Sequence, residues 1–512
     1  MAFSTVVSAS FHGLLVETVY VEADISNGLP AFHMVGYLSS EVKEASERVR
    51  TAIKNSGYQI PPKKVVINFA PADVRKRGAS FDLPIALGLL GSMGIFPLEK
   101  LNRIMVVGEL SLDGKVKKVN GVLPIVMHAR EIGMEACILP AENALEGALV
   151  EGIRVFGAES LRDICMCLTG EKTPVEVKNK QKDKYMNFLA SDILDYEDVY
   201  GQEAVKRAVE IAVSGGHNIL FLGPPGSGKT MIAKRIPTIL PTLTMEESME
   251  ITKIYSVLGM LDKERPLITG RPFRSVHHTV TKTALAGGGT LPMPGEISLA
   301  HGGVLFLDEL AEFQKPVLEV LRQPLEERQI RITRKNGSYI FPANFILAAA
   351  LNPCPCGNYP DLTKCTCTTG QIKQYIGKIS QPFLDRIDIC VETPRVKYEA
   401  LKGKEKGESS ESLRKRIEKV REIQLERYKG TGVLTNSMLE GSELEKYCTL
   451  GEKEEKIMKQ AFSALSLSAR TYHKILKVSR TIADMDGSEK IREEHLMEAI
   501  GYRAVDKKYW GR

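Results

Sequence analysis

The feature that most constrains the fold of this chain is a glycine-rich loop between an apolar run and a helical segment. It reads Gly223-Pro224-Pro225-Gly226-Ser227-Gly228-Lys229-Thr230, after Asn218-Ile-Leu-Phe-Leu222. Glycines let consecutive backbone N–H groups converge on phosphate oxygens, and the N-terminus of the following helix favours anions. Lys229 can reach the β and γ phosphates, and the Thr230 hydroxyl can hold Mg²⁺. The order of strand, loop and helix therefore predicts a nucleoside-triphosphate site on an α/β sheet.

A second apolar run supports the same site. Gly303-Val-Leu-Phe-Leu307 has the pattern of a buried strand and ends in Asp308 and Glu309. Asp308 would organise Mg²⁺ and its waters, while Glu309 would orient and deprotonate the attacking water. The alternative is a strand end with a solvated acidic pair. Because the glycine-rich loop lies upstream, the spacing favours the catalytic interpretation.

Composition limits the remaining classes. The chain has 512 residues with a formal net charge of +6, so nucleic-acid binding would depend on local clusters of basic residues. It contains no apolar run of membrane-spanning length, and its N-terminus lacks the pattern of a secretory signal. The nine cysteines, four of them in one short segment, indicate a reducing compartment. We expect a cytoplasmic protein.

Residues 1–170 have the alternating strand and helix patterns of an α/β domain. Runs rich in β-forming residues predict strands at 64–70, 103–108 and 136–139. Apolar residues at helical spacing predict helices at 41–56, 83–90 and 124–132. This order resembles the Lon-protease-like domain. The resemblance aligns Ser80 with the nucleophilic serine of Lon and Leu123 with its partner lysine. A serine nucleophile needs a base, which leucine cannot provide. We therefore expect the Lon-like fold without a Ser/Lys dyad rather than an active peptidase.

Three further regions follow that domain. Residues 171–191 are charged and poor in apolar residues, as in a solvated linker. Residues 192–394 form the nucleotide-binding region, for which we expect a parallel sheet. Residues 395–512 have mostly helical patterns, with a hydrophilic break at 402–411 that predicts a loop.

The nucleotide-binding region resembles AAA+ ATPases. In that family the segment containing Gln202 lies near the adenine, and the apolar strand before Asn352 matches the one that ends in the sensor-1 residue. The segment Phe383-Leu-Asp-Arg386-Ile-Asp388 resembles the one that carries an arginine finger, which acts in a neighbouring subunit and so requires an oligomer. A surface salt bridge of Arg386 with Asp385 or Asp388 is the alternative.

The C-terminal helical region resembles an AAA+ lid. There the motif Ser468-Ala-Arg470 matches the one that supplies the sensor-2 arginine, which implies this role for Arg470. A charge on a helix surface is the alternative.

Two insertions resemble the magnesium-chelatase and MCM-helicase branch of AAA+ proteins. The stretch between Pro266 and Gly295 contains no acidic residue and includes three consecutive glycines, as in the helix-2 insert of that branch. Residues 329–341 read as a β-hairpin with a favoured Asn-Gly turn at 336–337, matching the pre-sensor-1 hairpin. Arg331, Arg334 and Lys335 could line a pore and contact DNA phosphates without reading sequence. The alternative is a solvated hairpin whose charges prevent edge pairing.

Four cysteines lie within one short segment, as the pairs Cys354/Cys356 and Cys365/Cys367. Four soft ligands in a cytosolic chain suit tetrahedral Zn²⁺, which would fix the loop after the sensor-1 strand. Free thiols or redox pairs are the alternatives.

Taken together, the Lon-like region, residues 295–309 and the motif Asn352-Pro-Cys-Pro-Cys-Gly357 resemble the ComM/YifB family of magnesium-chelatase-like AAA+ ATPases. The resemblance implies ATP and Mg²⁺ as cofactors and a homo-oligomeric ring, expected to be a hexamer. It also implies helicase action on single-stranded or branched DNA, as in branch migration during natural transformation, with no membrane and no small-molecule substrate beyond ATP. The alternative is the motor subunit of a magnesium chelatase. An unfoldase partner of a protease is disfavoured, because the dyad is lost and no aromatic pore loop is evident.

Overall fold

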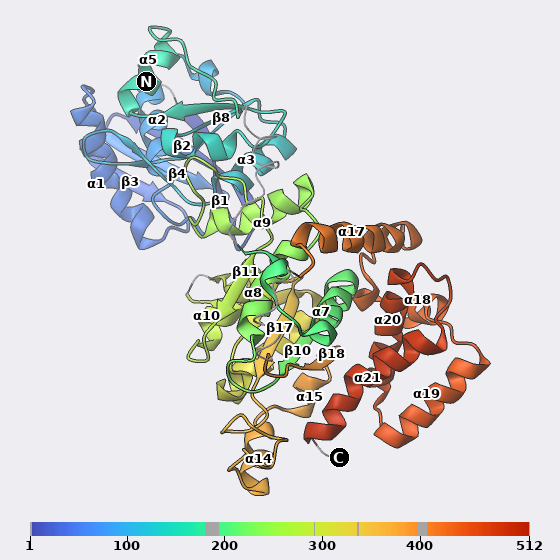
Figure 1. Ribbon diagram of the computed structural model, residues 1–512. Coiled ribbons are helices and arrows are strands. Elements are labelled where there is room, and N and C mark those ends of the chain that lie inside the picture. Colours follow the sequence, from blue (N-terminus) through green and yellow to red (C-terminus); the bar gives the residue numbers. More distant parts are fainter. Residues whose placement is uncertain (1–2, 180–193, 291, 335–336, 397–406, 511–512) are drawn as a thin grey trace. The chain divides into compact units, whose positions relative to one another are not determined.

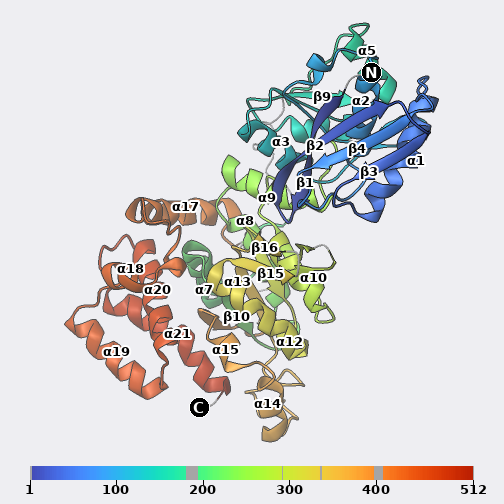
Figure 2. The same ribbon diagram turned by 180° about the vertical axis from the view of Figure 1, so that it is seen from behind.

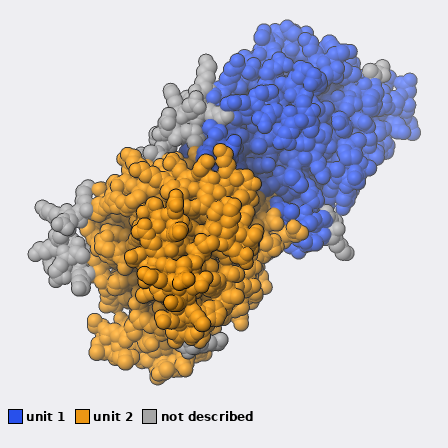
Figure 3. Space-filling view, turned by 90° about the vertical axis from the view of Figure 1, so that its right-hand side faces the viewer, with its two compact units in different colours: residues 1–189, 244–269, 333–340 blue, residues 190–243, 270–332, 341–512 orange. Residues whose placement is uncertain are grey.

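The computed structural model describes residues 3–179, 194–290, 292–334, 337–396 and 407–510 (Figures 1 and 2). The chain divides into two compact units (Figure 3). Unit 1 contains residues 1–189, 244–269 and 333–340, and unit 2 contains residues 190–243, 270–332 and 341–512. Among the described helices, none has both the length and the apolar character needed to span a bilayer.

Unit 1 is built on a mixed seven-stranded sheet in the order β3-β4-β2-β1-β5-β8-β9. Its long central strands are antiparallel, whereas β5, β8 and β9 extend it in parallel from β1. The bounds are β1 Ser4–His12, β2 Leu15–Ser26, β3 Ala31–Val35, β4 Lys64–Ala70, β5 Ile104–Val106, β8 Ala136–Pro140 and β9 Arg154–Ala158. A small separate pair, β6 Glu109–Leu110 and β7 Val116–Lys117, follows β5.

Helices complete the core of unit 1. They are α1 Ser40–Asn55, α2 Asp82–Ser92, α3 Val122–Glu131, α4 Ala144–Gly147, α5 Leu161–Thr169 and, from later in the chain, α9 Met245–Val257, which packs on α3. Helix α1 buries Val42, Ala45 and Val49, the spacing of a single helix face. Helix α2 is buried along its whole length, so its apolar residues surround the helix rather than forming a stripe.

Unit 2 contains a five-stranded, all-parallel sheet in the order β11-β14-β17-β10-β18 (Figure 1). The strands are β10 Ile219–Leu222, β11 Phe273–Val276, β14 Val304–Leu307, β17 Ile346–Leu351 and β18 Ile389–Glu392. Every residue of β10, β14 and β17 is buried, as expected for central strands covered on both faces. The carboxyl ends of these strands lie at one edge of the sheet, which is where parallel sheets bind ligands.

The helices of the nucleotide-binding part of unit 2 precede its first strand or lie between its strands. They are α7 Glu203–Gly215, α8 Lys229–Ile239, α10 Lys282–Ala286, α11 Glu296–Leu299, α12 Lys315–Leu318, α13 Arg322–Glu327, α14 Thr369–Ile376 and α15 Gln381–Leu384. Two short ribbons are also present. In unit 2, β12 Gly287–Gly288 pairs with β13 Met293–Pro294. The second ribbon pairs β15 Gln329–Arg334 with β16 Gly337–Pro342 (Figure 2), and its residues 333–340 belong to unit 1.

The rest of unit 2 is helical. Its members are α17 Ser410–Arg427, α18 Gly441–Tyr447, α19 Glu452–Leu465, α20 Ala469–Met485 and α21 Glu493–Trp510. Ser466 ends α19 in the left-handed conformation, and the Ser468 side chain accepts a hydrogen bond from the backbone N–H of Thr471 to start α20.

This architecture confirms the predicted fold class, with an α/β N-terminal region, a parallel sheet and a helical C-terminal region. Residues 180–191 of the expected linker, residues 402–406 of the expected loop, and Lys335 and Asn336 of the expected hairpin turn lie outside the described residues.

Candidate nucleotide-hydrolysis site

Three neighbouring strands of the parallel sheet bring the predicted nucleotide residues together. Leu222, the last residue of β10, pairs with Leu351 of β17, and Leu307 of β14 pairs with Ala349 of β17. The glycine-rich loop, the acidic pair and Asn352 follow these strands directly. They therefore share the carboxyl edge of the sheet.

The glycine-rich loop has the backbone that its sequence requires. Gly226 and Gly228 have φ values of 74° and 88°, which residues with a Cβ rarely adopt. Gly223 passes so close to the chain after β18 that a Cβ would lie 2.1 Å from the carbonyl oxygen of Thr393. Glycine is therefore required at these positions by conformation and by space.

Lys229 is buried at the start of α8 and turns back onto the loop. Its Nζ donates hydrogen bonds to the carbonyl oxygens of Gly223 and Pro224, at 2.7 and 2.9 Å, and to Asn352 Oδ1 at 3.1 Å. Burial lowers the pKa of Lys229 to about 8, while the carboxylates of Asp308 and Glu309 oppose this shift. A phosphate bound in the loop would place a negative charge beside Lys229 Nζ and favour its protonated form.

Thr230 and Asp308 are in direct contact. Thr230 Oγ1 donates a hydrogen bond to Asp308 Oδ2 at 2.7 Å, and the backbone N–H of Glu309 donates to Asp308 Oδ1 at 2.9 Å. A hydroxyl and a carboxylate side by side offer the oxygen ligands that Mg²⁺ prefers. The residues present therefore fit a magnesium ion, which Thr230 and Asp308 would hold.

Glu309 combines an unusual backbone with an accessible side chain. Its φ is 52°, a left-handed conformation rare for a residue with a long side chain, and 58% of the side chain is exposed. Such strain is typical of sites where a side chain must be held in a particular direction. The carboxylate is thus directed outward from the strand end, where a water could reach it.

His278 is a neighbour of Glu309 to which sequence reasoning assigned no role. Its Nδ1 lies 3.8 Å from Glu309 Oε2, and its ring lies 4.0 Å from that of His277. The parallel pairing of β11 with β14 aligns Val276 with Leu307, so residues two positions beyond each strand end become neighbours. The contact between His278 and Glu309 depends on this strand pairing, which the sequence alone does not give.

Unpaired polar atoms surround the loop. Ser227 Oγ, Gln202 Oε1 and Thr393 Oγ1 are buried and have no hydrogen-bond partner among the described residues. Buried polar groups are normally paired, so these atoms fit a site that a polar ligand completes. Gln202 also donates from Nε2 to the carbonyl oxygen of Ser227 at 2.6 Å, so it supports the loop directly.

Next to these residues is a cleft of about 590 Å³. It is lined by the catalytic candidates and by residues that follow β17, namely Glu309, Glu312, Asn352, Pro355, Gln371, Gln374, Tyr375 and Lys378. The cleft gives Glu309 and Asn352 access to solvent.

The two predicted arginines lie away from the glycine-rich loop of their own chain. Asn218, before the amino end of β10, donates from Nδ2 to the carbonyl oxygen of Arg386 at 3.0 Å, whereas the loop follows the carboxyl end of that strand. Arg386 is 7% exposed and pairs with Glu326 at 2.6 Å. Arg470 is 58% exposed at its side chain and approaches the same Glu326 oxygen at 3.9 Å.

This placement changes two interpretations from the sequence. The partner of Arg386 is Glu326, not Asp385 or Asp388. Arg470 shares an edge with Arg386, so in this conformation the lid does not direct it to the phosphates of its own site. The reason is that Glu326 of α13 contacts both Arg386, which follows α15, and Arg470 of α20, residues distant from it in sequence.

Two of the predicted DNA-contacting residues, Arg331 and Arg334, lie on the β15–β16 hairpin, and Lys335 is outside the described residues. Arg331 and Arg334 are both exposed on β15. Within unit 1, the ring of Tyr339 stacks on that of His12, with centroids 4.2 Å apart and planes at 10°. The distal part of the hairpin therefore has an aromatic support, which the sequence pattern did not indicate.

The two Lon-like positions hold a partly buried serine and a leucine. Leu123 is fully buried, and its backbone N–H donates to Glu146 Oε1 at 2.9 Å. The backbone of Ser80 accepts a hydrogen bond from Gly108 N at 2.9 Å. Leu123 offers no proton acceptor, as the sequence indicated.

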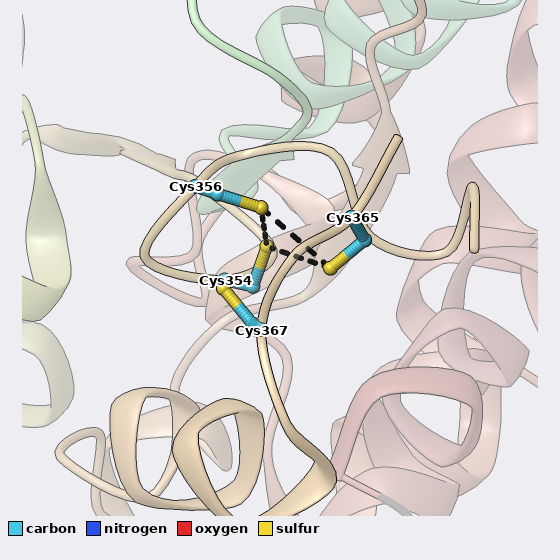
Figure 4. A group of neighbouring side chains, drawn as sticks. All are labelled: Cys354, Cys356, Cys365 and Cys367. Carbon is cyan, nitrogen blue, oxygen red and sulfur yellow. Dashed lines mark hydrogen bonds between the residues drawn. The ribbon is translucent and has the colours of Figure 1, made fainter. Parts of the chain in front are cut away.

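The four cysteines of the segment after β17 form a tight cluster (Figure 4). Their Sγ atoms all lie within 4.8 Å of one another, with Cys354 to Cys356 at 3.4 Å, Cys356 to Cys365 at 3.6 Å and Cys354 to Cys365 at 3.8 Å. Cys354 is buried, and the others, including Cys367, are partly buried. The cluster is compatible with a tetrahedral zinc ion.

Comparison with known proteins agrees with this geometry. The family model for magnesium chelatase, subunit ChlI, matches residues 195–401; the models for subunit ChlI of Mg-chelatase and for the ChlI C-terminal region match residues 21–143 and 407–503. Competence protein ComM of Haemophilus influenzae is 43% identical over 509 residues, which is 99% of this chain and 98% of that protein. YifB of Escherichia coli is 41% identical over 508 residues, again 99% and 98% of the two chains. The chain belongs to the ComM/YifB family.

Its N-terminal part has a separate relationship. Lon protease 2 of Bacillus subtilis is 28% identical over 127 residues, or 24% of this chain and 22% of that protein. The ComM/YifB protein described here is thus an AAA+ ATPase of the magnesium-chelatase-like type, expected to use ATP and Mg²⁺, with a Lon-like region before the ATPase part.

Proposed function

We propose that this ComM/YifB protein couples ATP hydrolysis to translocation on DNA or to remodelling of DNA. The observation that carries the ATPase part is the direct contact of Thr230 with Asp308 beside Lys229 and Asn352. The DNA part rests on the similarity to a competence protein and on the exposed basic hairpin. In this proposal the family's action on branched DNA during natural transformation extends to this chain.

Hydrolysis would use the residues at the sheet edge in distinct roles. Glu309 accepts a proton from the attacking water while the water oxygen forms a bond to the γ-phosphorus. The bond between the γ-phosphorus and the oxygen that joins it to the β-phosphate breaks, which releases ADP. Lys229 neutralises charge on the phosphates, and Asn352 orients the water and the γ-phosphate. Thr230 and Asp308 would hold the Mg²⁺ that shields the phosphate charge.

The arginines imply an assembly. Arg386 and Arg470 share the sheet edge opposite the glycine-rich loop, so they would serve the site of a neighbouring subunit. Head-to-tail contacts of this kind close into rings, and we propose a homo-hexamer. Arg386 would leave Glu326 to reach that phosphate.

Other parts of the proposal concern the metal and the compartment. The four-cysteine cluster would hold a structural Zn²⁺. We also propose a cytoplasmic location, supported by the fact that no disulfide joins any of the nine cysteines, all of which lie within the described part of the chain, as a reducing compartment favours.

The deciding experiment measures ATP hydrolysis with single-stranded, branched and duplex DNA, and with a porphyrin. We expect stimulation by DNA that declines steeply as salt rises, because phosphate contacts release counterions. A variant with Arg334→Ala and Lys335→Ala should bind DNA more weakly and keep basal hydrolysis. The exposed Arg162→Ala in α5 is the matched control.

Two outcomes would contradict the proposal. An active ATPase that no DNA form stimulates at low salt would exclude the DNA function. Stimulation by porphyrin instead would favour the second candidate, a metal-chelatase motor, which the match of residues 195–401 to the magnesium-chelatase model supports.

A further inference from the structure

The four-cysteine cluster is part of a segment that contacts the nucleotide site. We call residues 353–368 the cysteine module; it joins the end of β17 to the start of α14. Asn352, the predicted sensor-1 residue, immediately precedes it, and Pro355 lines the cleft beside Glu309. The module is thus continuous with the hydrolysis site in sequence and in space.

The sulfur positions match one metal ion rather than disulfides. With Zn–S bonds of about 2.3 Å, tetrahedral geometry places neighbouring sulfurs roughly 3.8 Å apart. The three measured separations run from 3.4 to 3.8 Å. A disulfide would bring two sulfurs to about 2.0 Å. The Sγ atoms of all four cysteines lie within 4.8 Å of one another, so together they supply the complete ligand set of one tetrahedral ion, which binds them as thiolates.

The module touches the glycine-rich loop at Gly357. Gly357 has a φ of 78°, and a Cβ added there would lie 2.2 Å from Pro225 Cδ and 2.9 Å from Pro225 Cγ. Gly357 lies next to the ligand Cys356, so its position is set by the cluster. The backbone of the module therefore packs directly on the loop that would hold the phosphates.

On another side the module contacts the last helix. The ring of Tyr359 meets that of Tyr509 edge to face with centroids 5.9 Å apart, and Tyr509 Oη donates to Glu392 at 2.6 Å. Trp510 Nε1 donates to the carbonyl oxygen of Ile376 in α14 at 3.3 Å. Helix α21 thus packs against both the module and the helix that follows it.

We propose that a zinc ion bound by Cys354, Cys356, Cys365 and Cys367 holds the module against Pro225, so that zinc occupancy sets the nucleotide affinity of the glycine-rich loop. Without the metal, the module would lose the bonds that order its turns, and the loop would lose its support at Gly357. Nucleotide would then have to order both segments on binding, which lowers its affinity. This inference rests on the proposed nucleotide site, and it is independent of the DNA function.

The test compares nucleotide binding with and without the metal in the full-length protein. Metal analysis of protein purified under reducing conditions should give about one zinc per chain, as a four-thiolate site binds one ion. Removal of zinc by a chelator should weaken the binding of Mg·ADP by about tenfold or more. The reason is that nucleotide binding must then order the side chains that zinc had held. Added Zn²⁺ should restore the affinity, and Mg²⁺ alone should not.

Two glycine variants separate the contact from the metal. Gly357→Ala should keep its zinc and still weaken Mg·ADP binding, because the new methyl group displaces Pro225. Gly370→Ala in α14 is the matched control; its nearest neighbour, Thr368 Oγ1, would be 3.9 Å away, so it should leave zinc and affinity unchanged.

Each negative result has a separate meaning. Protein that binds Mg·ADP tightly without zinc, or whose affinity survives chelation, overturns the inference and leaves the ATPase proposal intact. Protein that retains zinc but binds no nucleotide contradicts the proposed function itself. Equal affinity of Gly357→Ala and Gly370→Ala would exclude the contact with Pro225 as the link.

Discussion

The two units of this protein differ in the residues found at their candidate reaction sites. In unit 2, three adjacent parallel strands end in polar residues that contact one another, such as Thr230 with Asp308 and Lys229 with Asn352. In unit 1, the Lon-like position of the catalytic lysine is Leu123, which is fully buried. Unit 2 thus brings candidate reactive groups into contact, whereas unit 1 has a buried leucine where the Lon alignment places a lysine.

The difference has a physical basis. A reaction site requires exposed or unpaired polar groups and strained backbone, such as the left-handed Glu309 and the unpaired Ser227 Oγ. Around Leu123 the polar groups are satisfied instead. Glu146 accepts hydrogen bonds from Leu123 N and from Asn143 Nδ2, at 2.9 and 3.0 Å. The comparison therefore predicts that substitutions at the sheet edge of unit 2 change ATP hydrolysis strongly and that substitutions at the Lon-like positions of unit 1 change it little.

The largest effect is expected for Glu309→Gln. Removing the general base should lower turnover of ATP by roughly 10²- to 10⁴-fold. Binding of ATP and the unfolding temperature should stay close to those of the unmodified protein, because the side chain is largely exposed. Single-turnover hydrolysis and nucleotide titration measure the two quantities.

Glu312→Gln is the matched control, since Glu312 lines the same cleft. Its salt bridge with Lys378, at 3.4 Å, is exposed and contributes little. If Glu312→Gln lowers turnover as much as Glu309→Gln, Glu309 is not the base.

A second, intermediate effect should come from mixing two inactive proteins. Lys229→Ala removes the phosphate contact, and Arg386→Ala removes the arginine proposed to act on a neighbour. In a 1:1 mixture, roughly a quarter of the head-to-tail interfaces in a ring would combine an intact loop with an intact arginine. Hydrolysis should therefore recover to at most about that fraction of the unmodified rate.

This experiment also addresses folding. Arg386 is buried and donates to the carbonyl oxygen of Arg322 at 3.2 Å, so its loss weakens the subunit itself. A merely misfolded Arg386→Ala chain would give no recovery on mixing. Mixed rings that form, as shown by size, and remain inactive would refute an arginine acting between subunits.

The sequence predicted the parts of this comparison that are encoded locally. The glycine-rich loop, the acidic pair and Asn352 each follow an apolar run, so their strand context could be inferred without the fold. Strand β1 was not anticipated. Three of its serines are buried, including Ser4, whose Oγ donates to the carbonyl oxygen of Gly88, so apolar alternation is weak.

Other features depend on contacts between distant segments. His278 lies beside Glu309 because β11 pairs with β14, and Glu326 of α13 contacts both Arg386 and Arg470, which lie 60 or more residues later in the chain. Helix α9 packs on α3 of unit 1 although it follows α8 in the chain. No local pattern of residues carries such information.

The smallest effect is expected at the Lon-like serine. Ser80→Ala removes a hydroxyl and retains the backbone carbonyl that accepts the hydrogen bond of Gly108 N. Stability should change by no more than about 0.5 kcal/mol, and ATP hydrolysis should be unchanged. The matched change in unit 2, Thr230→Ala, removes a hydroxyl that contacts Asp308 and should abolish hydrolysis. Chemical unfolding, ATPase assays and a peptidase assay on both variants complete the comparison. Peptide cleavage by the unmodified protein that Ser80→Ala removes would show that unit 1 carries its own reaction despite Leu123.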